Sequence, residues 1–222
     1  MAEHTVKAFD EDITRLRGLI GEMGGLAEVA IEEALASLVA GDSDRASRVV
    51  TGDKRIDELE TQVEKFAVRV IALRAPMADD LREVIAALKI AAVVERIGDY
   101  SKNIAKRVGS IENRDRFEPL TLLPAMADIA GEMVHDALTA YAARDPMLAR
   151  EVIATDNKVD AFYNSIFRNL VTYMVENPAT ISSAAQLLFV ARNLERIGDH
   201  ATNIAEMVHF AATGQYPPED DR

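Results

Sequence analysis

Pairs of acidic residues recur at helical spacing in two distant parts of this 222-residue chain. Glu95 and Asp99 open the segment 95–105, and Glu195 and Asp199 open the segment 195–205; eight of the eleven positions are identical. On a helix, residues four apart share one face, with their β-carbons about 5–6 Å apart. Two carboxylates so close repel each other unless a cation or a proton neutralises them. The chain is therefore predicted to contain two copies of one unit, each with its own acidic site.

A second acidic pair is repeated as well. Asp53 and Asp57 match Asp156 and Asp160, and in each copy the aspartates flank an apolar stripe. If the two helices of a copy align, four carboxylates converge on one candidate metal site. The eight candidate metal ligands are Asp53, Asp57, Glu95 and Asp99 in the first copy, and Asp156, Asp160, Glu195 and Asp199 in the second. Oxygen ligands favour hard cations such as Mg²⁺, Mn²⁺, Ca²⁺ or iron. The sequence does not discriminate among Fe, Mn, Mg and Zn.

The helical phase places Glu95 at the edge of an apolar face. At about 100° per residue, Ala91, Leu88 and Val84 lie within about 60° of it, and Leu188 and Ala191 stand in the same relation to Glu195. A carboxylate at such an edge must be neutralised by an arginine, a proton or a metal ion. Ion pairs made by Arg96 and Arg196 with neighbouring helices would meet that need without a metal. From the residues alone, both readings stay open.

Other residues near the acids suggest packing rather than chemistry. Gly98 and Gly198 lie in the middle of predicted helices, where glycine costs about 1 kcal/mol relative to alanine. We interpret them as points where a neighbouring helix approaches closely beside the acids. His200 adjoins Asp199 but points about 100° away from it. His4, His135 and His209 have no counterparts in the other copy, and all four histidines, His200 included, are interpreted as surface or hydrogen-bonded residues.

The pattern of apolar residues is helical throughout, which predicts an all-α protein. Glycine, asparagine, aspartate and proline break it into six segments, with Asp42 and Asp145 as N-caps and Pro146 as the first residue of a helix. The predicted helices span residues 5–39, 43–74, 78–110, 118–143, 146–175 and 179–212. They form two tandem three-helix bundles, over residues 1–112 and 113–222. The end of the chain, from Gly214, is expected to fray.

Composition narrows the possible functions. The absence of cysteine excludes disulfides, thiolate metal ligands and thiol catalysis. A formal net charge of −12 opposes binding to nucleic acid or to anionic lipid through a basic face. Neither a secretory signal nor an apolar run long enough to span a membrane is recognisable, so a cytoplasmic protein without membrane insertion is expected. There is no glycine-rich phosphate loop and no repeated Ser/His or Lys/Ser arrangement, so we expect no enzymatic activity.

These motifs resemble those of the PhoU family, accessory proteins of bacterial phosphate transport and phosphate signalling. The resemblance covers essentially the whole chain. It is carried by the segment 75–82, which reads Ala-Pro-Met-Ala-Asp-Asp-Leu-Arg, and by the Glu-Arg-Ile-Gly-Asp run that begins at Glu95. The second copy lacks Asp-Leu-Arg, and its segment from Pro178 to Glu195 is two residues shorter than the segment from Pro76 to Glu95. That departure suggests that Asp80 and Arg82 serve packing or a partner rather than the repeated site.

The resemblance implies two three-helix bundles whose acidic motifs, at the eight positions given above, hold metal ions, iron clusters among them. It further implies a cytoplasmic negative regulator that keeps a PhoR-like sensor histidine kinase inhibitory when phosphate is plentiful. Such a regulator acts in contact with a phosphate ABC transporter of the PstSCAB type, with its PstB component as the expected contact, and a homodimer is expected. Two alternatives remain. One is a carboxylate-bridged multi-iron enzyme, although neither repeat offers the Glu-x-x-His pairs of that class. The other is an accessory protein of a different phosphate permease.

Overall fold

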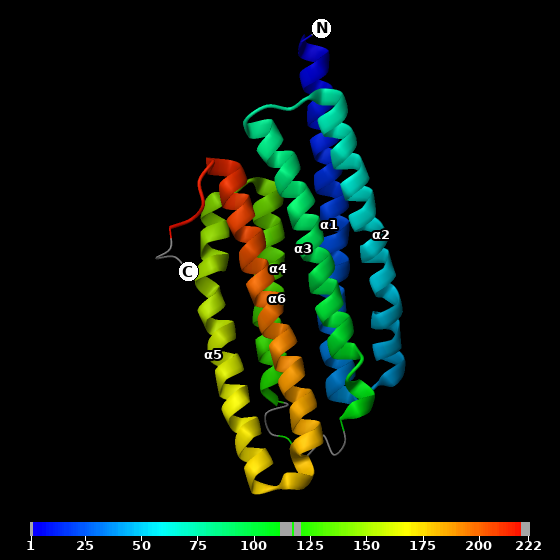
Figure 1. Cartoon of the computed structure of the whole chain (residues 1–222), viewed down its shortest axis with the longest axis vertical. Coiled ribbons are helices and arrows are strands. Elements are labelled where there is room, and N and C mark those ends of the chain that lie inside the picture. Colours follow the sequence, from blue (N-terminus) through cyan, green and yellow to red (C-terminus); the bar gives the residue numbers. More distant parts are fainter. Residues whose placement is uncertain (1, 112–116, 118–120, 219–222) are drawn as a thin grey trace.

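The computed structural model confirms the all-α prediction across the residues it describes, which are 2–111, 117 and 121–218, with side chains from residue 7 onward. Six long helices run roughly along one axis of an elongated molecule (Figure 1). They are α1 (Ala2–Ala40), α2 (Ser43–Arg74), α3 (Asp79–Ala105), α4 (Leu122–Ala143), α5 (Pro146–Glu176) and α6 (Ile181–Thr213). Two single turns of 3₁₀-helix, η1 (Val108–Ser110) and η4 (Pro178–Thr180), accompany α3 and α6.

The predicted caps are present. The side chain of Asp42 accepts a hydrogen bond of 2.9 Å from the backbone N–H of Arg45 at the start of α2. Asp145 accepts from the backbone N–H groups of Met147 and Leu148 at the start of α5, and Pro146 is the first helical residue. Each aspartate satisfies backbone donors that the first turn of a helix leaves without partners.

Two helices are shorter than predicted. The α-helix expected to reach residue 110 ends at Ala105, because the N–H of Arg107 bonds to Ile104 and that of Ser110 to Arg107, the tighter spacing of a 3₁₀ turn. Similarly, α6 begins at Ile181 rather than at 179, because Pro178 and the Asn177 side chain shape a 3₁₀ turn first. The fourth helix begins its regular α turns at Leu122, whereas its predicted start at 118 and the predicted boundary between residues 112 and 113 lie outside the described residues.

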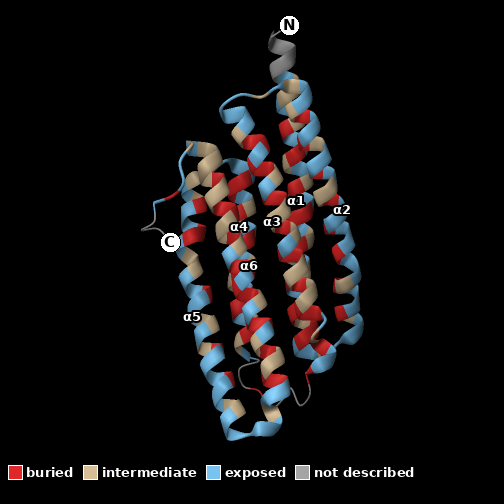
Figure 2. Ribbon diagram, viewed as in Figure 1, coloured by how far each residue is buried: buried red, intermediate tan, exposed pale blue. Residues whose placement is uncertain are grey.

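The six helices form two three-helix bundles, α1–α3 and α4–α6, that pack side by side. The contacts between the bundles run mainly from α3 to α6 and from α1 to α4. These four helices therefore occupy the centre of the molecule, with α2 and α5 on its two flanks (Figure 1). Buried residues concentrate on the inward faces of the helices (Figure 2). In α2, Ile56, Leu59 and Val63 form the buried stripe that the aspartates flank. The stripe predicted in α5 is Val159, Phe162 and Ile166, of which Val159 and Ile166 are buried and Phe162 is partly buried against the core.

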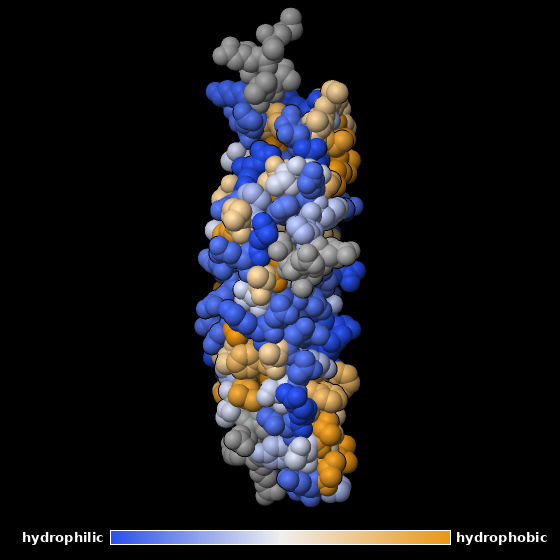
Figure 3. Space-filling model, turned by 90° about the vertical axis from the view of Figure 1, so that its left-hand side faces the viewer, coloured by the Kyte–Doolittle hydropathy of each residue, from blue (hydrophilic) through white to orange (hydrophobic). Residues whose placement is uncertain are grey.

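The surface is mostly polar, as the net charge leads one to expect. Figure 3, which looks onto the α5 side, shows hydrophilic side chains over most of that face and hydrophobic ones near its lower edge. Exposed apolar residues do lie near the turn between α5 and α6, namely Val171, Val175 and Ile181. Within the described part of the chain, no helix is both long enough and apolar enough to cross a membrane.

Candidate functional site: two acidic clusters

The first acidic cluster lies between α2 and α3. Its four predicted residues differ in exposure: Asp53 is buried, Asp57 is exposed, and Glu95 and Asp99 are intermediate. A lysine joins the two helices here. The ammonium group of Lys102 forms an ion pair with Asp53 and lies 2.5 Å from Oδ1 of Asp99. The structure thus brings Asp53 and Asp99 together around a cation that belongs to the protein itself.

The charges in this cluster shift one another's pKa values. Burial opposes the charge of Lys102, but its hydrogen bonds to Asp53 and Asp99 raise its pKa well above the usual value, so it stays charged. Although Asp57 is exposed, partial loss of its contact with water and the charge of Asp53 raise its pKa. Burial and the charge of Asp99 raise the pKa of Glu95. Lys102 therefore neutralises Asp53 and Asp99. Asp57 and Glu95 have no such partner in this cluster, and neighbouring negative charges disfavour their ionised forms.

The second cluster, between α5 and α6, has the same carboxylates without the lysine. The residue that corresponds to Lys102 is Thr202. Burial, followed by the charges of Asp199 and Asp160, raises the pKa of Asp156 to about 6. The pKa of Asp199 is also raised, by burial and by Asp160. Asp156 therefore lacks the ammonium partner that Asp53 has in the first cluster, whereas the charges of Arg192 and Arg196 partly offset the raised pKa of Asp199.

Glu195 is the most buried carboxylate of the second cluster, with 8 % of its surface exposed. One carboxylate oxygen forms an ion pair with Arg192, whose counterpart in the first repeat is Ala92. The other oxygen, Oε2, is buried and has no hydrogen-bond partner. Burial and the charge of Asp199 raise the pKa of Glu195. A buried carboxylate oxygen without a donor is unfavourable, and a bound cation would relieve it.

Two glycines explain how the helices come close enough to form these clusters. A β-carbon built onto Gly98 would lie 2.9 Å from Cδ1 of Ile56 and 3.2 Å from Oδ1 of Asp53. One built onto Gly198 would lie 3.3 Å from Cγ1 of Val159, and 3.4 Å from Oδ1 of Asp156. The predicted close approach beside the acids is confirmed in both repeats. The same contacts show that Asp53 and Asp156 occupy equivalent places.

The donor chemistry of the clusters suits a hard cation, since every predicted ligand is a carboxylate. As the side chains lie, however, no three His, Asp or Glu residues in the described part of the chain are grouped so that they could hold a metal ion together. Binding would require the side chains to rotate toward a common point. The second cluster fits a cation better, because Thr202 leaves open the position that the ammonium group of Lys102 fills in the first.

Histidine and arginine side chains beside the motifs contribute to the contact between the bundles. The ring of His200 stacks on Tyr100, with centroids 5.4 Å apart and planes at 18°. The guanidinium carbon of Arg196 lies 5.7 Å from the centre of the Tyr100 ring. Burial and the charges of Arg96 and Arg196 lower the pKa of His200. Residues 100 and 200 are equivalent in the repeats, so equivalent positions of α3 and α6 meet at the contact between the bundles.

Two features of the site were not anticipated from the sequence. The pairing of Lys102 with Asp99 could have been inferred, because Lys102 lies three residues later on the same helical face and is one of the three positions that differ between the segments 95–105 and 195–205; its pairing with Asp53 on another helix could not. No sequence signal marks the second feature. Glu83 is buried where α1, α3 and α4 meet, paired with Arg17 and 3.2 Å from Nη1 of Arg144.

The neighbouring Arg82 also has a structural role. A β-carbon built onto Gly214, at the end of α6, would lie 3.6 Å from the guanidinium carbon of Arg82. The Arg82 side chain also bonds to Asp79, at 2.5 Å. Arg82 thus packs against the C-terminal end of α6, which agrees with the first of the two predicted roles, packing or a partner.

Comparisons with known proteins support the internal repeat. The protein-family model of the PhoU domain matches this chain twice, over residues 20–108 and over residues 123–208. A phosphate-specific transport system accessory protein PhoU homolog from Zymomonas mobilis is 54 % identical over 219 residues, which is 99 % of this chain and 92 % of that protein. The crystal structure of PhoU from Pseudomonas aeruginosa superposes with a TM-score of 0.87 at 35 % identity and covers 93 % of this chain and all of that one. The phosphate transport system regulatory protein PhoU from Streptococcus pneumoniae gives a TM-score of 0.88 at 26 % identity over 95 % of this chain and 99 % of that one.

Proposed function

This chain belongs to the PhoU family, and on that premise we propose that it is a non-catalytic accessory protein of a phosphate transport system that restrains phosphate-starvation signalling. Support comes from relatives named as accessory and regulatory proteins of phosphate transport, across nearly the full length of the chain. In this proposal the protein acts in the cytoplasm as a homodimer. It contacts the PstB component of a PstSCAB-like phosphate transporter and connects that transporter with a PhoR-like sensor histidine kinase.

Metal binding at the acidic clusters is the second part of the proposal. The observation that carries it is the second cluster, where Asp156, Glu195 and Asp199 have raised pKa values and Oε2 of Glu195 is buried without a partner. A bound iron or divalent cation would neutralise these carboxylates and fix α5 against α6. The first cluster would bind a cation more weakly, because Lys102 already pairs with Asp53 and Asp99.

Metal analysis tests this part directly. The protein is purified without chelators or a histidine tag, its metal content is measured, and the metal-free form is titrated with Fe²⁺, Mn²⁺, Mg²⁺ and Zn²⁺. We expect the double variant Asp156→Asn, Asp199→Asn to lose binding at the second cluster while its circular dichroism stays helical. Lys158→Gln, which changes an exposed residue between Asp156 and Asp160, serves as a control. No binding by the parent protein to any of these ions would refute the metal proposal.

The regulatory part is tested in cells. We expect deletion of the gene to raise expression of a starvation-induced phosphatase in phosphate-replete medium, and restoration of the intact gene to lower it again. Low phosphatase expression in the deletion strain would show that the chain is not a negative regulator. Complementation with the Asp156→Asn, Asp199→Asn variant then separates the two parts. Full repression by a variant that binds no metal at the second cluster would show that regulation does not need that metal.

A further inference from the structure

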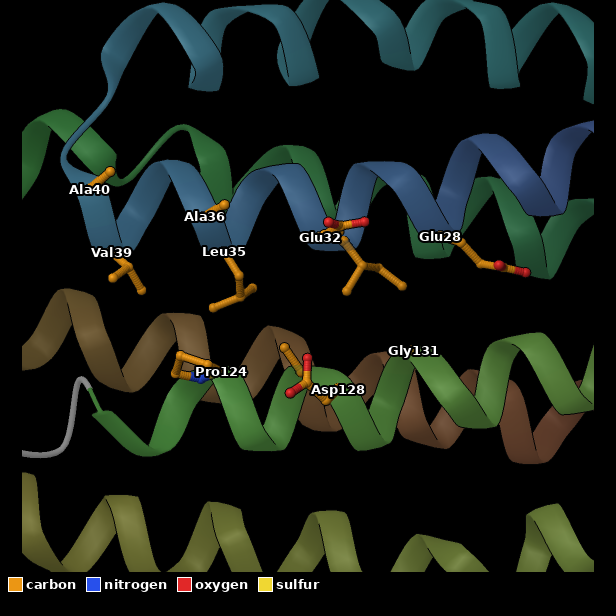
Figure 4. Close-up of a pocket in the computed structure, with 11 residues that line it drawn as sticks. Glu28, Glu32, Leu35, Ala36, Val39, Ala40, Pro124, Asp128 and Gly131 are labelled. Atoms are coloured by element: carbon orange, nitrogen blue, oxygen red, sulfur yellow. The ribbon is translucent and has the colours of Figure 1, made fainter.

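A groove runs along the face of the molecule opposite α3 and α6, between α1 and α4. The two helices are antiparallel and approach closely at Gly24, where an added β-carbon would overlap Cδ1 of Leu138. From there toward Ala40 and Pro124 they leave a hollow of about 520 Å³. In Figure 4, Leu35 and Val39 on α1 point across this hollow toward α4. A second hollow of about 470 Å³ shares Glu28 and Gly131 with the first and extends it toward His135.

The floor of this groove is apolar, and about half of the residues that line the first hollow are small. Ile31, Leu35 and Ala127 are buried at its base, and Val39 is 47 % exposed at its end. Alanine, glycine and proline make up much of the remaining lining, at Ala36, Ala40, Pro124 and Gly131. Between Glu28 and Ala40, helix α1 rises about 18 Å, or more than three helical turns. Small residues over that length leave room for the apolar side chains of another helix.

Among the described residues, every Asp or Glu side chain that lines the groove lies without a lysine or arginine beside it in the lining. Glu28 and Glu32 on α1 and Asp128 on α4 line the first hollow. Glu132 and Asp136 line the second, together with His135, whose Nδ1 lies 3.3 Å from Oε2 of Glu28. Neither residues 18–40 of α1 nor the whole of α4 contains a lysine or an arginine. An apolar floor with an acidic rim is complementary to a helix whose apolar face is flanked by basic residues.

We propose that this α1/α4 groove is a docking site for a basic amphipathic helix of a partner protein. Apolar side chains at positions i, i+3 or i+4, and i+7 of that helix would pack over Leu35 and Val39. Lysine or arginine residues on its flanks would pair with Glu32 and Asp128. The acidic clusters on α2/α3 and α5/α6 are not part of this surface, so the proposal does not depend on metal binding.

The charge of the chain argues against a second copy as the occupant. Each copy carries a formal net charge of −12, so docking of one copy into this acidic rim would bring like charges together. An anionic lipid surface is disfavoured for the same reason. A basic helix meets no such repulsion, and the same acidic rim would also accelerate its association at low salt.

The probe for this proposal is a fluorescent 18-residue peptide designed as an amphipathic helix, with leucines on one face and lysines on its flanks. Its binding to the full chain is followed by anisotropy at about physiological salt, which screens weak surface attraction. We expect saturable binding, and we expect it to weaken about tenfold or more in Gly131→Leu, which fills the groove, and in Glu32→Lys, Asp128→Lys, which reverses its rim. A β-carbon at position 131 meets no atom within 4 Å, so the first variant is expected to fold normally.

The control variant Glu64→Lys, Glu151→Lys makes the same change in net charge at exposed positions on α2 and α5. It is expected to change the affinity less than about twofold, as suits distant surface charges. If the control weakened binding as much as the groove variants do, the net charge of the chain alone would explain the binding, and the proposal would be overturned. Absence of binding, or equal binding of a peptide with glutamate in place of lysine, would overturn it as well.

Sedimentation of the full chain tests whether a second copy of the chain occupies the groove instead. A parent dimer that Gly131→Leu converts to a monomer would assign the groove to a second copy and overturn the proposal, whereas an unchanged oligomeric state agrees with it. These measurements use neither metal nor phosphate signalling. Their failure is therefore distinguishable from failure of the regulatory function proposed above.

Discussion

Lys102 on α3 forms an ion pair with Asp53 on α2, whereas Thr202, which occupies the same position in the second repeat, carries no charge. The two acidic clusters therefore have the same carboxylates but different electrostatics. In the first, the protein supplies the cation that holds α2 and α3 together. In the second, Asp156 and Asp199 lie near each other with raised pKa values. This difference leads to predictions about stability, protonation and cation binding.

Replacing Lys102 with methionine should lower the free energy of unfolding by about 2 kcal/mol, because buried Asp53 loses its partner. Urea denaturation of the metal-free protein measures this change. Lys89→Met, at an exposed position on the same helix, is the matched control and should change stability by less than about 0.5 kcal/mol. Similar losses in both variants would mean that the ion pair adds nothing specific.

The converse substitution, Thr202→Lys, should make the second cluster resemble the first. An ammonium group near Asp156 and Asp199 should raise the free energy of unfolding of the metal-free protein by about 1 kcal/mol at neutral pH. It should also weaken cation binding at the second cluster, because the lysine competes for the same carboxylates. Thermal melting with and without a divalent cation measures both effects. A variant that binds cations as tightly as the parent would contradict the equivalence of the two positions.

Stability should depend on pH through Asp156. Its pKa is about 6 in the folded protein, above the value of about 3.9 expected when unfolded, so the folded state binds this proton more tightly. The free energy of unfolding should therefore fall as the pH rises between about 4 and 6. Allowing for the partial exposure of Asp156, acidification from about pH 7 to pH 5 should stabilise the metal-free protein by about 1 kcal/mol.

Unfolding in urea with a chelator present, repeated across that pH range, tests the assignment. Asp156→Asn should be more stable than the parent near neutral pH and should lose much of the gain on acidification. Lys158→Gln alters charge in the same turn of α5 without removing the carboxylate and should keep the gain. An undiminished pH dependence in Asp156→Asn would assign the effect to other carboxylates of the cluster.

Gly98→Ala should destabilise the protein, although alanine favours a helix. The added β-carbon would lie 2.9 Å from Ile56 and 3.2 Å from Asp53, so these buried side chains or the helices themselves must shift, at a cost of about 1–3 kcal/mol. Gly198→Ala meets its nearest atom at 3.3 Å and should cost less. Gly21→Ala, with no atom within 4 Å, should stabilise the protein by about 0.5–1 kcal/mol. Thermal unfolding of the three variants should reproduce that order; a stabilising Gly98→Ala would contradict the close approach of α2.

Glu83→Gln should weaken the packing of the two bundles. It leaves Arg17 and Arg144 without a charged partner where α1, α3 and α4 meet, which should cost about 2–3 kcal/mol. Glu33→Gln, which breaks a more exposed pair with Arg45, should cost less than about 1 kcal/mol. Urea denaturation measures both. Equal effects would show that the buried pair contributes no more than a surface pair.

Much of the fold could be predicted from the chain alone, because its signals are local. Helical periodicity and the caps at Asp42 and Asp145 depend on residues within a few turns of one another. The repeat is visible when the two halves of the sequence are compared, and the role of Gly98 and Gly198 follows from the cost of glycine inside a helix. The ends of α3 and α6 were harder to predict, since 3₁₀ turns at Val108–Ser110 and Pro178–Thr180 satisfy backbone groups over only a few residues. Such ends are decided by small differences in backbone hydrogen bonding.

The sequence by itself determined which residues could form an acidic site, because chemical type and spacing along a helix are written directly in it. Only the tertiary structure decided how each site is neutralised. The partner of Asp53 lies on another helix, 49 residues further along the chain, and no pattern in either helix specifies that pairing. The buried Glu83 cluster and the α1/α4 groove have the same origin. They exist because helices distant in sequence pack at a particular register, and side-chain packing across the whole molecule sets that register.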